Sequence, residues 1–368
     1  MPMAVTHDWV IRALFAVVAC INSGCSVTPV SVREISGRPM VHGEGVNLPP
    51  SLGSLGTIAS GQIVEKGDLN LGEQVATRGF SRSGLVIQRI LLAENYEIKG
   101  LLHRHRTSGE GEAAVTLLIP QPKSPLRAFY TADYVYVPVT IMNSYGRSKI
   151  KDERPGFRII DDESTTQGGG NLGALATDTT LPLAMLLSHT RFVPEQYRGL
   201  LNPERFRGTR GLFLLEPYDS NKVPILMIHG LMSSPLTWME LTNELLGDAY
   251  VRTHYQIWHY VYPTGQSLFY SAKGLRDSLD ALKRAVALAH LPQPKPIVVI
   301  GHSMGGLLAK SLVCDSGDSL WDAVFTVRPE RLAASEAALN DLRGSFFSKR
   351  EKMSRKSFLW QHRSAGAI

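Results

Sequence analysis

The sequence predicts an α/β protein in which a mostly parallel sheet with flanking helices follows a β-rich region. Three observations support this class. From about Leu212 onward, short β-branched runs alternate with longer segments of helical periodicity, the pattern of parallel strands joined by crossover helices. Before that point, strand-like runs are separated by turns. In addition, two of the later strands run into glycine-containing turns, at His229-Gly230 and at Gly301 to Gly305.

In the second half of the chain, strands and helices are expected to alternate strictly. We expect strands at 223–228, 256–262 and 297–300, and helices at 236–246, 271–290 and 304–313. The first helix has a start signal in Ser234-Pro235. The second places its apolar residues on one face, with 3.6-residue periodicity, at Leu275, Leu279, Leu282, Val286 and Ala289.

The stretch around Ser303 combines a β-branched strand, a Gly-x-Ser-x-Gly turn and an apolar helical run. In so sharp a turn the serine adopts a strained backbone conformation and its hydroxyl stands clear of the sheet. Side chains at Gly301 or Gly305 would collide across the turn. The amide of Met304, at the positive end of the following helix, can donate to an oxyanion beside Ser303. Ser303 is therefore a candidate nucleophile.

A second strand-to-loop unit lies upstream, where 223–228 ends in His229-Gly230 and a small polar loop follows. Such a loop can present the amide of Leu231 as a second oxyanion donor. Together the two units resemble the α/β-hydrolase superfamily, in particular lipases and esterases such as GPI-inositol-deacylase-like and bacterial lipase relatives. The resemblance implies attack of Ser303 on a lipid or carboxylic ester, an acyl-enzyme intermediate, and no cofactor or metal.

The partners of the serine depart from this family's pattern. A serine needs an imidazole to take its proton and a carboxylate to orient that imidazole, and the family supplies them in the order Ser, Asp or Glu, His. His362 is the one histidine after Ser303 and is the candidate base. The later carboxylates include Asp315, Asp318, Asp322 and Asp341, and Asp315 and Asp318 come too early for the usual acid.

Because the late strands of the family are missing, we expect a truncated product, for example by a frameshift near Lys356. A compact variant that uses His362 is the competing interpretation. The functional alternative to an esterase is a catalytically inactive hydrolase fold that acts as a binding or surface module.

An apolar run that follows Arg12 and ends at Ile21 is too short to span a bilayer and fits the core of a signal peptide. Residues 1–25 are therefore expected to be a signal of the lipoprotein type, with Cys25 as the lipidated residue and Cys20 as the alternative. This predicts an exported protein of the bacterial cell envelope, lipid-anchored or periplasmic. A plain cleaved signal and a cytosolic apolar helix stay open.

The remaining chain is divided by composition. Residues 26–74 are rich in Gly, Pro and Ser and indicate a tether, 75–211 form a β-rich accessory region, and 212–368 form the hydrolase domain. Strands are expected at 113–119 and 134–142, and Pro138 predicts that the second is an edge strand or is bulged. The accessory strands are candidates to extend the edge of the hydrolase sheet.

Charge and cysteine content narrow the function classes. The 368 residues are 43% hydrophobic and 20% charged with a net charge of +6, and the basic residues are scattered, which argues against nucleic-acid binding. Three cysteines cannot build a disulfide framework, and Cys314 is expected to be buried. His103-Arg104-His105 is interpreted as a solvated basic segment, because no carboxylate lies near it in the sequence. The oligomeric state is left open.

Overall fold

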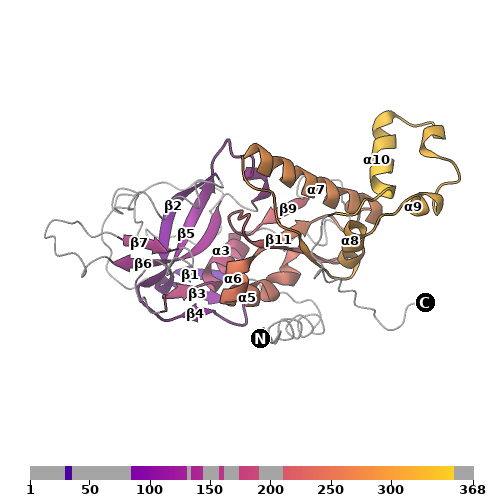
Figure 1. The fold of residues 1–368 in the computed structure, drawn as a ribbon. Helices are drawn as coiled ribbons and strands as arrows, with labels where there is room; N and C mark the ends of the chain where they lie inside the picture. The colour runs from indigo at the N-terminus through magenta and orange to yellow at the C-terminus, as the bar shows by residue number, and fades with distance from the viewer. Residues whose placement is uncertain are drawn as a thin grey trace, which may run out of the picture. The chain divides into compact units, whose positions relative to one another are not determined.

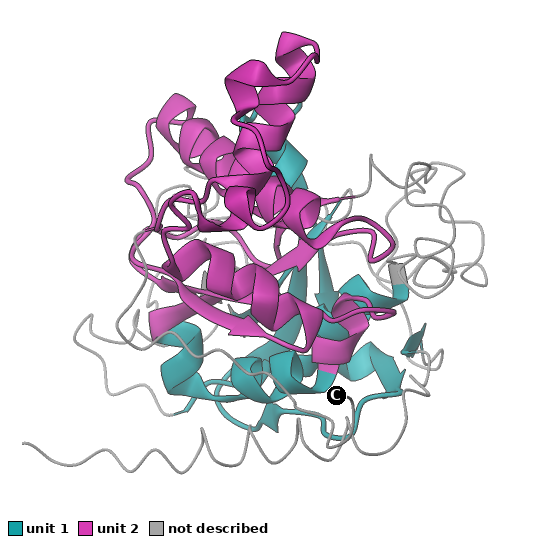
Figure 2. Ribbon diagram, turned by 90° about the vertical axis from the view of Figure 1, so that its right-hand side faces the viewer, with its two compact units in different colours: residues 1–190, 240–253 teal, residues 191–239, 254–368 magenta. Residues whose placement is uncertain are grey.

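The computed structural model describes residues 30–34, 84–130, 134–143, 157–160, 174–189 and 210–351. The expected signal peptide with Cys20 and Cys25, most of the tether, and His362 lie outside these residues. The chain forms two compact units, which Figure 2 shows in different colours. Unit 1 comprises residues 1–190 and 240–253, and unit 2 comprises residues 191–239 and 254–368.

Unit 1 is built on a four-stranded antiparallel sheet with the order β2-β5-β6-β7 (Figure 1). Its strands are β2 (Leu85–Leu92), β5 (Glu112–Pro120), β6 (Val135–Asn143) and β7 (Phe157–Ile160). Two short antiparallel pairs join β1 (Ser31–Glu34) to β3 (Tyr96–Lys99) and β4 (Arg106–Thr107) to β8 (Thr177–Asp178). The single turns η2 (Ala93–Asn95) and η3 (Arg127–Phe129) lie between strands.

Helices complete unit 1. They are α3 (Thr180–His189), which packs against β1, β3 and β6, and the pair α5 (Met239–Gly247) and α6 (Ala249–His254), of which residues 240–253 belong to this unit. The β-branched and aliphatic residues of β2, β5 and β6 form its core, with Ile90, Ala114, Val139 and Ile141 buried together. β1 falls within the segment expected to be a tether. Its residues pair in register with β3, so this part of the segment belongs to the fold of unit 1.

The expectations for Pro138 and for the accessory strands need correction. β6 has β5 on one side and, from Thr140 onward, β7 on the other. Only the part of β6 before Thr140 therefore lies at an edge. Pro138 lies before the pairing with β7 begins, where its missing N–H breaks no ladder. The bulge is in β2, between Ile87 and Arg89. In the described part of the chain, the strands of unit 1 form sheets of their own and do not extend the later sheet.

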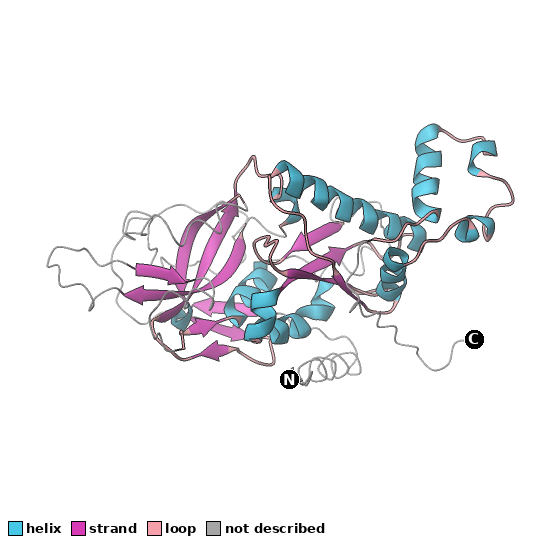
Figure 3. Cartoon of the chain, viewed as in Figure 1, coloured by secondary structure: helices cyan, strands magenta, loops and turns pink. Residues whose placement is uncertain are grey.

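Unit 2 contains the α/β part of the chain. Its sheet has the order β12-β10-β11-β9, formed by β9 (Gly211–Leu214), β10 (Val223–Ile228), β11 (Tyr255–Val261) and β12 (Val298–Gly301). β10 is parallel to both β11 and β12, and β9 is antiparallel to β11. The helices are α7 (Leu268–Leu288), α8 (Met304–Val313), α9 (Ser319–Asp322) and α10 (Glu336–Phe346), as Figure 3 shows, with the turn η7 (Pro329–Arg331) before α10. The α/β class is confirmed.

The sequence pattern accounts for most of these elements. β10 is buried along nearly its whole length, as expected for a central parallel strand. α7 buries the predicted apolar face and packs against β9 and α8, and α8 packs against β12 and β10. The expected helix at 236–246 is instead the turn η6 (Pro235–Trp238) followed by α5. Ser234 begins this turn, and its hydroxyl accepts a hydrogen bond from the Leu236 amide at 3.4 Å.

The segment after α8 is held by aromatic packing. The ring of Trp321 stacks on the rings of Phe325 and Phe347, with centroids 4.2 Å and 5.6 Å apart. The ring of Phe325 meets that of Phe346 edge-on, with centroids 5.2 Å apart. Cys314 is exposed, so the expectation of a buried cysteine is wrong, because this residue ends α8 and enters a surface loop. Among the described residues, no helix is long and apolar enough to cross a membrane.

Candidate active site

Ser303 lies between β12 and α8 in a conformation that L-amino acids rarely adopt, with φ 52° and ψ −121°. Such a backbone costs about 1–3 kcal/mol and persists only where its surroundings enforce it. Here the turn is closed by the Gly305 amide, which donates to the His302 carbonyl at 2.8 Å, and by the Gly306 amide, which donates to the Ser303 carbonyl at 2.9 Å. The strained turn predicted for the serine is therefore present.

The two glycines of the turn allow this close packing. A Cβ on Gly301 would lie 2.5 Å from the carbonyl oxygen of Gly305. A Cβ on Gly305 would overlap the carbonyl oxygen of Ile228 and lie 2.5 Å from that of His229. Because these neighbours are backbone atoms, they cannot move aside as a flexible side chain would. The collision across the turn that was expected from the sequence is confirmed for Gly301, whereas the space at Gly305 is limited by the end of β10 and the residue after it.

The His-Gly loop and the serine turn come together in the structure. Ile228 pairs with Gly301 at the end of the parallel ladder, and the His302 amide donates to the Ile228 carbonyl at 3.0 Å. A Cβ on Gly230 would lie 3.1 Å from the Cβ of Ser303 and 2.9 Å from Nδ1 of His302. The backbone of the loop therefore packs directly on the serine, which brings together the two motifs identified in the sequence.

His229 anchors the start of this loop. Its Nδ1–H donates to the Gly230 carbonyl at 3.1 Å, its Nε2 accepts from the Tyr262 amide at 3.5 Å, and its ring stacks on Tyr262 at 4.5 Å. The Tyr262 hydroxyl donates to the His229 carbonyl at 2.8 Å. Burial lowers the pKa of His229 to about 4. The imidazole is thus neutral at pH 7, and its partners assign the proton to Nδ1.

The two predicted oxyanion donors belong to the two segments that meet at Ser303. Leu231 follows Gly230, whose backbone packs on the serine, and its side chain is 51% exposed. Met304 is the first residue of α8, so its amide is one of the four at a helix start that have no acceptor within the helix. The next residue of the loop, Met232, has φ 53°, and its amide donates to Oγ1 of Thr264 at 3.3 Å.

The predicted base, His362, lies outside the described residues. The four candidate carboxylates have other partners: Asp318 and Asp322 pair with Arg328, Asp341 pairs with Lys273, and Asp315 accepts from the Arg350 amide. These contacts place the carboxylates in interactions at the protein surface.

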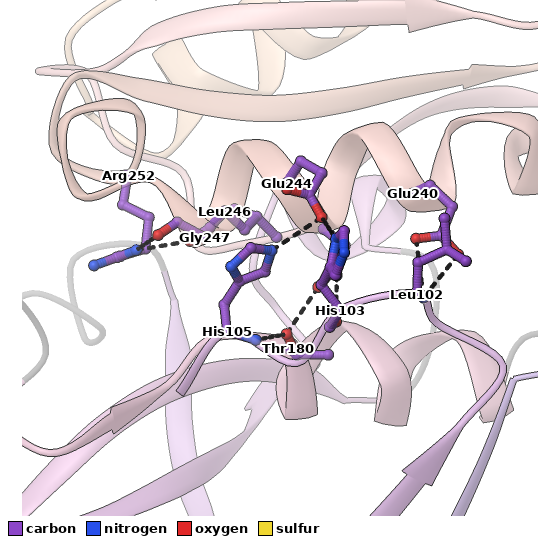
Figure 4. A network of polar contacts seen from close by, with 10 residues as sticks. Leu102, His103, His105, Thr180, Glu240, Glu244, Leu246, Gly247 and Arg252 are labelled. Atoms are coloured by element: carbon purple, nitrogen blue, oxygen red, sulfur yellow. Dashed lines mark hydrogen bonds and ion pairs between the residues drawn. The ribbon is translucent and has the colours of Figure 1, made fainter. Parts of the chain in front are cut away.

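In unit 1, His103 and His105 have a carboxylate partner that the sequence did not reveal. His103 Nδ1 and His105 Nε2 lie 2.8 Å and 3.1 Å from the same oxygen of Glu244, on α5 (Figure 4). Thr180 also accepts from the His105 amide at 2.8 Å. The premise that no carboxylate lies near this segment is therefore wrong, although His103 and Arg104 are exposed as expected of a solvated segment. Among the described residues, no group of three His, Cys, Asp or Glu side chains is placed to hold a metal ion.

Sequence reasoning missed the supporting roles of Tyr262 and Thr264. Both follow β11, in the Tyr-Pro-Thr-Gly stretch of residues 262–265 at the end of the strand expected at 256–262. A polar side chain directly after a parallel strand was the available signal, because the carboxyl ends of neighbouring parallel strands share one edge of the sheet.

Comparison with known proteins agrees with this geometry. The model of the alpha/beta hydrolase family matches residues 225–365, which include most of β10, the His-Gly loop, α7 and the serine turn. A comparison with curated proteins gives no match. Over residues 225–365 this chain is thus similar to the alpha/beta hydrolase family.

Proposed function

We propose that the protein is a serine hydrolase of the lipase or esterase type, which cleaves a lipid or carboxylic ester through an acyl-enzyme. The observation that carries the proposal is the strained Ser303, presented between β12 and α8 with the His-Gly loop packed against it. A strained backbone at an exposed turn is typical of a functional serine, since a structural serine has no need of it.

The proposed reaction uses groups of this chain. The Ser303 oxygen attacks the ester carbonyl carbon, and the carbonyl electron pair moves to its oxygen, where the amides of Leu231 and Met304 stabilise the negative charge. The hydroxyl proton passes to the base, for which His362 is the candidate, and then to the leaving alcohol. Water then attacks the acyl-serine, releases the carboxylic acid and restores Ser303.

Apolar side chains beside the serine favour an apolar ester. Leu231 is 51% exposed, Met232 is 49% exposed, and Leu307, one helical turn after Ser303, is 40% exposed. Exposed side chains of this size next to a nucleophile offer contacts to an acyl chain.

The second candidate function is a catalytically inactive hydrolase fold that acts as a binding or surface module. It is favoured by one observation, that the four candidate carboxylates have partners at the protein surface, which are Arg328, Lys273 and the Arg350 amide. An imidazole that no carboxylate orients is a poor base for a serine nucleophile.

A fluorophosphonate probe separates the two functions, because it labels activated serines without requiring the natural substrate. We expect the full chain to be labelled and Ser303→Ala to stay unlabelled. The matched control is Ser311→Ala on the same helix, whose hydroxyl already donates to the Leu308 carbonyl at 2.7 Å; it should label like the wild type. A folded wild-type protein that resists the probe would refute the esterase and favour the binding module.

The proposal extends to an exported protein that is anchored to the cell envelope by a lipid on Cys25, with Cys20 as the alternative position. Its support is the short apolar run after Arg12 followed by these cysteines. Metabolic labelling with an alkyne fatty acid in a bacterial host should be lost in Cys25→Ser and kept in Cys20→Ser. The reverse result assigns the lipid to Cys20. If neither protein is labelled, the anchor is contradicted.

A further inference from the structure

The loop of residues 229–232, here named the oxyanion loop, is held through two consecutive peptide groups. The first joins Gly230 to Leu231, and its carbonyl accepts the hydrogen bond from His229 Nδ1 at 3.1 Å. The described peptide bonds are trans, so the carbonyl and the N–H of one peptide group point in opposite directions. The Leu231 N–H is consequently directed away from the His229 imidazole.

The second peptide group joins Leu231 to Met232, and its N–H donates to Thr264 Oγ1 at 3.3 Å. This bond occurs where the chain most needs support, because Met232 has φ 53° and carries a side chain. The side chains of Leu231 and Met232 are about half exposed and pack little, whereas Thr264 is only 5% exposed. The hydrogen bond that the Met232 amide donates to this buried side chain is therefore the main contact that restrains the peptide group.

Thr264 follows β11, which is the neighbour of β10, the strand that leads into the oxyanion loop. β11 runs parallel to β10 with Tyr260 opposite Ile228, so the chain after β11 emerges beside the oxyanion loop. The Tyr262 hydroxyl bonds to the His229 carbonyl from the same side. On the other side, the backbone of Gly230 packs on Ser303. The loop is thus supported by β11 and by the serine turn together.

We propose that Thr264 is a positioning residue, which holds the Leu231–Met232 peptide group and thereby fixes the direction in which the Leu231 amide is presented. This inference rests on the proposed ester hydrolysis, in which that amide donates to the oxyanion. An oxyanion donor acts mainly on the transition state, so a loosened loop lowers kcat and leaves KM nearly unchanged.

The test compares Thr264→Val with Thr264→Ser in the full chain. Valine keeps the shape of the side chain and removes the acceptor, whereas serine keeps the hydroxyl. Thermal melting first shows that both variants fold, with Thr264→Ala as the replacement if valine does not. Hydrogen–deuterium exchange of the peptide that covers 229–234 then reports on the loop, and turnover of a p-nitrophenyl ester reports on its effect.

We expect Thr264→Val to exchange faster in this peptide and to lose about 10- to 100-fold in kcat at similar KM, the range for a misplaced catalytic group. Thr264→Ser should restore most of both values. Wild-type exchange and kcat in the valine variant would overturn the proposal, and so would a serine variant as poor as valine. If the wild type has no esterase activity, the proposed function fails by itself, and unchanged exchange then also removes the role of Thr264 in holding the loop.

Discussion

At the scale of single residues, Gly305 determines whether the serine turn can form. A side chain at this position meets the carbonyl oxygens of Ile228, the last residue of β10, and of His229, which follows it. We therefore expect Gly305→Ala to push α8 away from β10, to lower the free energy of unfolding by about 1–3 kcal/mol as overpacking does, and to abolish labelling of Ser303 by the fluorophosphonate probe. Urea unfolding and probe labelling measure the two effects.

The control for this variant is Gly211→Ala in β9. There the added Cβ has Phe213 as its nearest neighbour, at 3.6 Å, an ordinary contact. This variant should label like the wild type. Equal labelling of Gly305→Ala would mean that the turn tolerates a side chain, contrary to the geometry.

At the scale of elements, the start of α3 depends on a half-buried ion pair. The Asp178 carboxylate is fully buried, accepts from the Leu181 amide at 2.9 Å and pairs with Arg104 at 2.7 Å. The same guanidinium donates to the carbonyls of Tyr96 and Ala93. Asp178→Ala removes the acceptor of both bonds, but water can solvate part of the Arg104 charge, which is 31% exposed, so the variant should lower the free energy of unfolding by about 1–3 kcal/mol.

Urea unfolding followed by circular dichroism measures this loss. Glu330→Ala is the comparison, because Glu330 and Arg343 form an exposed pair at 3.4 Å that is worth less than about 1 kcal/mol. If the two variants were equally stable, the ion pair would not be what holds α3. An Arg104→Ala, Asp178→Ala double variant should lose much less than the sum of the two single variants.

At the scale of the whole molecule, buried histidines set the response to acid. Burial lowers the pKa of His229 to about 4 and the pKa of His259 to about 3, whereas an unfolded histidine titrates near about 6.5. Between these values the unfolded chain binds protons that the folded chain does not. The stability that these residues contribute is therefore complete above about pH 6.5 and is lost as the pH falls toward 4 and then 3.

Tryptophan fluorescence during urea unfolding follows this effect, because the described tryptophans, Trp238, Trp258 and Trp321, all lie in unit 2. We expect the unfolding midpoint to be steady from pH 8 to about 7 and to fall below about 6.5, with a shallower fall in His259→Gln. His290→Gln serves as the exposed control and should keep the wild-type slope. A pH profile that is identical in all three proteins would contradict the prediction.

Much of the α/β unit was predictable from its local pattern. Short β-branched runs predicted β10, β11 and β12 to within about two residues, since a strand buried on both faces needs continuous apolar residues. The spacing of Leu275, Leu279 and Leu282 predicted α7. The need for Gly301 was predictable because a side chain there would collide with the backbone of Gly305, only four residues away, whereas a side chain on Gly305 would meet the distant carbonyls of Ile228 and His229.

Other features could not be predicted because their partners are distant in sequence. Glu244 lies 139 residues from His105, so no local pattern announces their contact. The same holds for Thr264 and Met232, which are 32 residues apart and meet because β10 and β11 are parallel neighbours. Pro138 suggested an edge strand, but the pairing with β7 begins only two residues later.

The sequence by itself determined the strand and helix order of the α/β unit, the strained serine turn and the His-Gly loop, because each depends on the conformational preferences of neighbouring residues. The tertiary structure decided that Gly230 packs on Ser303, that Thr264 and His229 hold the oxyanion loop, and that Glu244 joins the two histidines of unit 1. These contacts are set by the register of parallel strands and the packing of helices, which bring together residues that no local pattern connects.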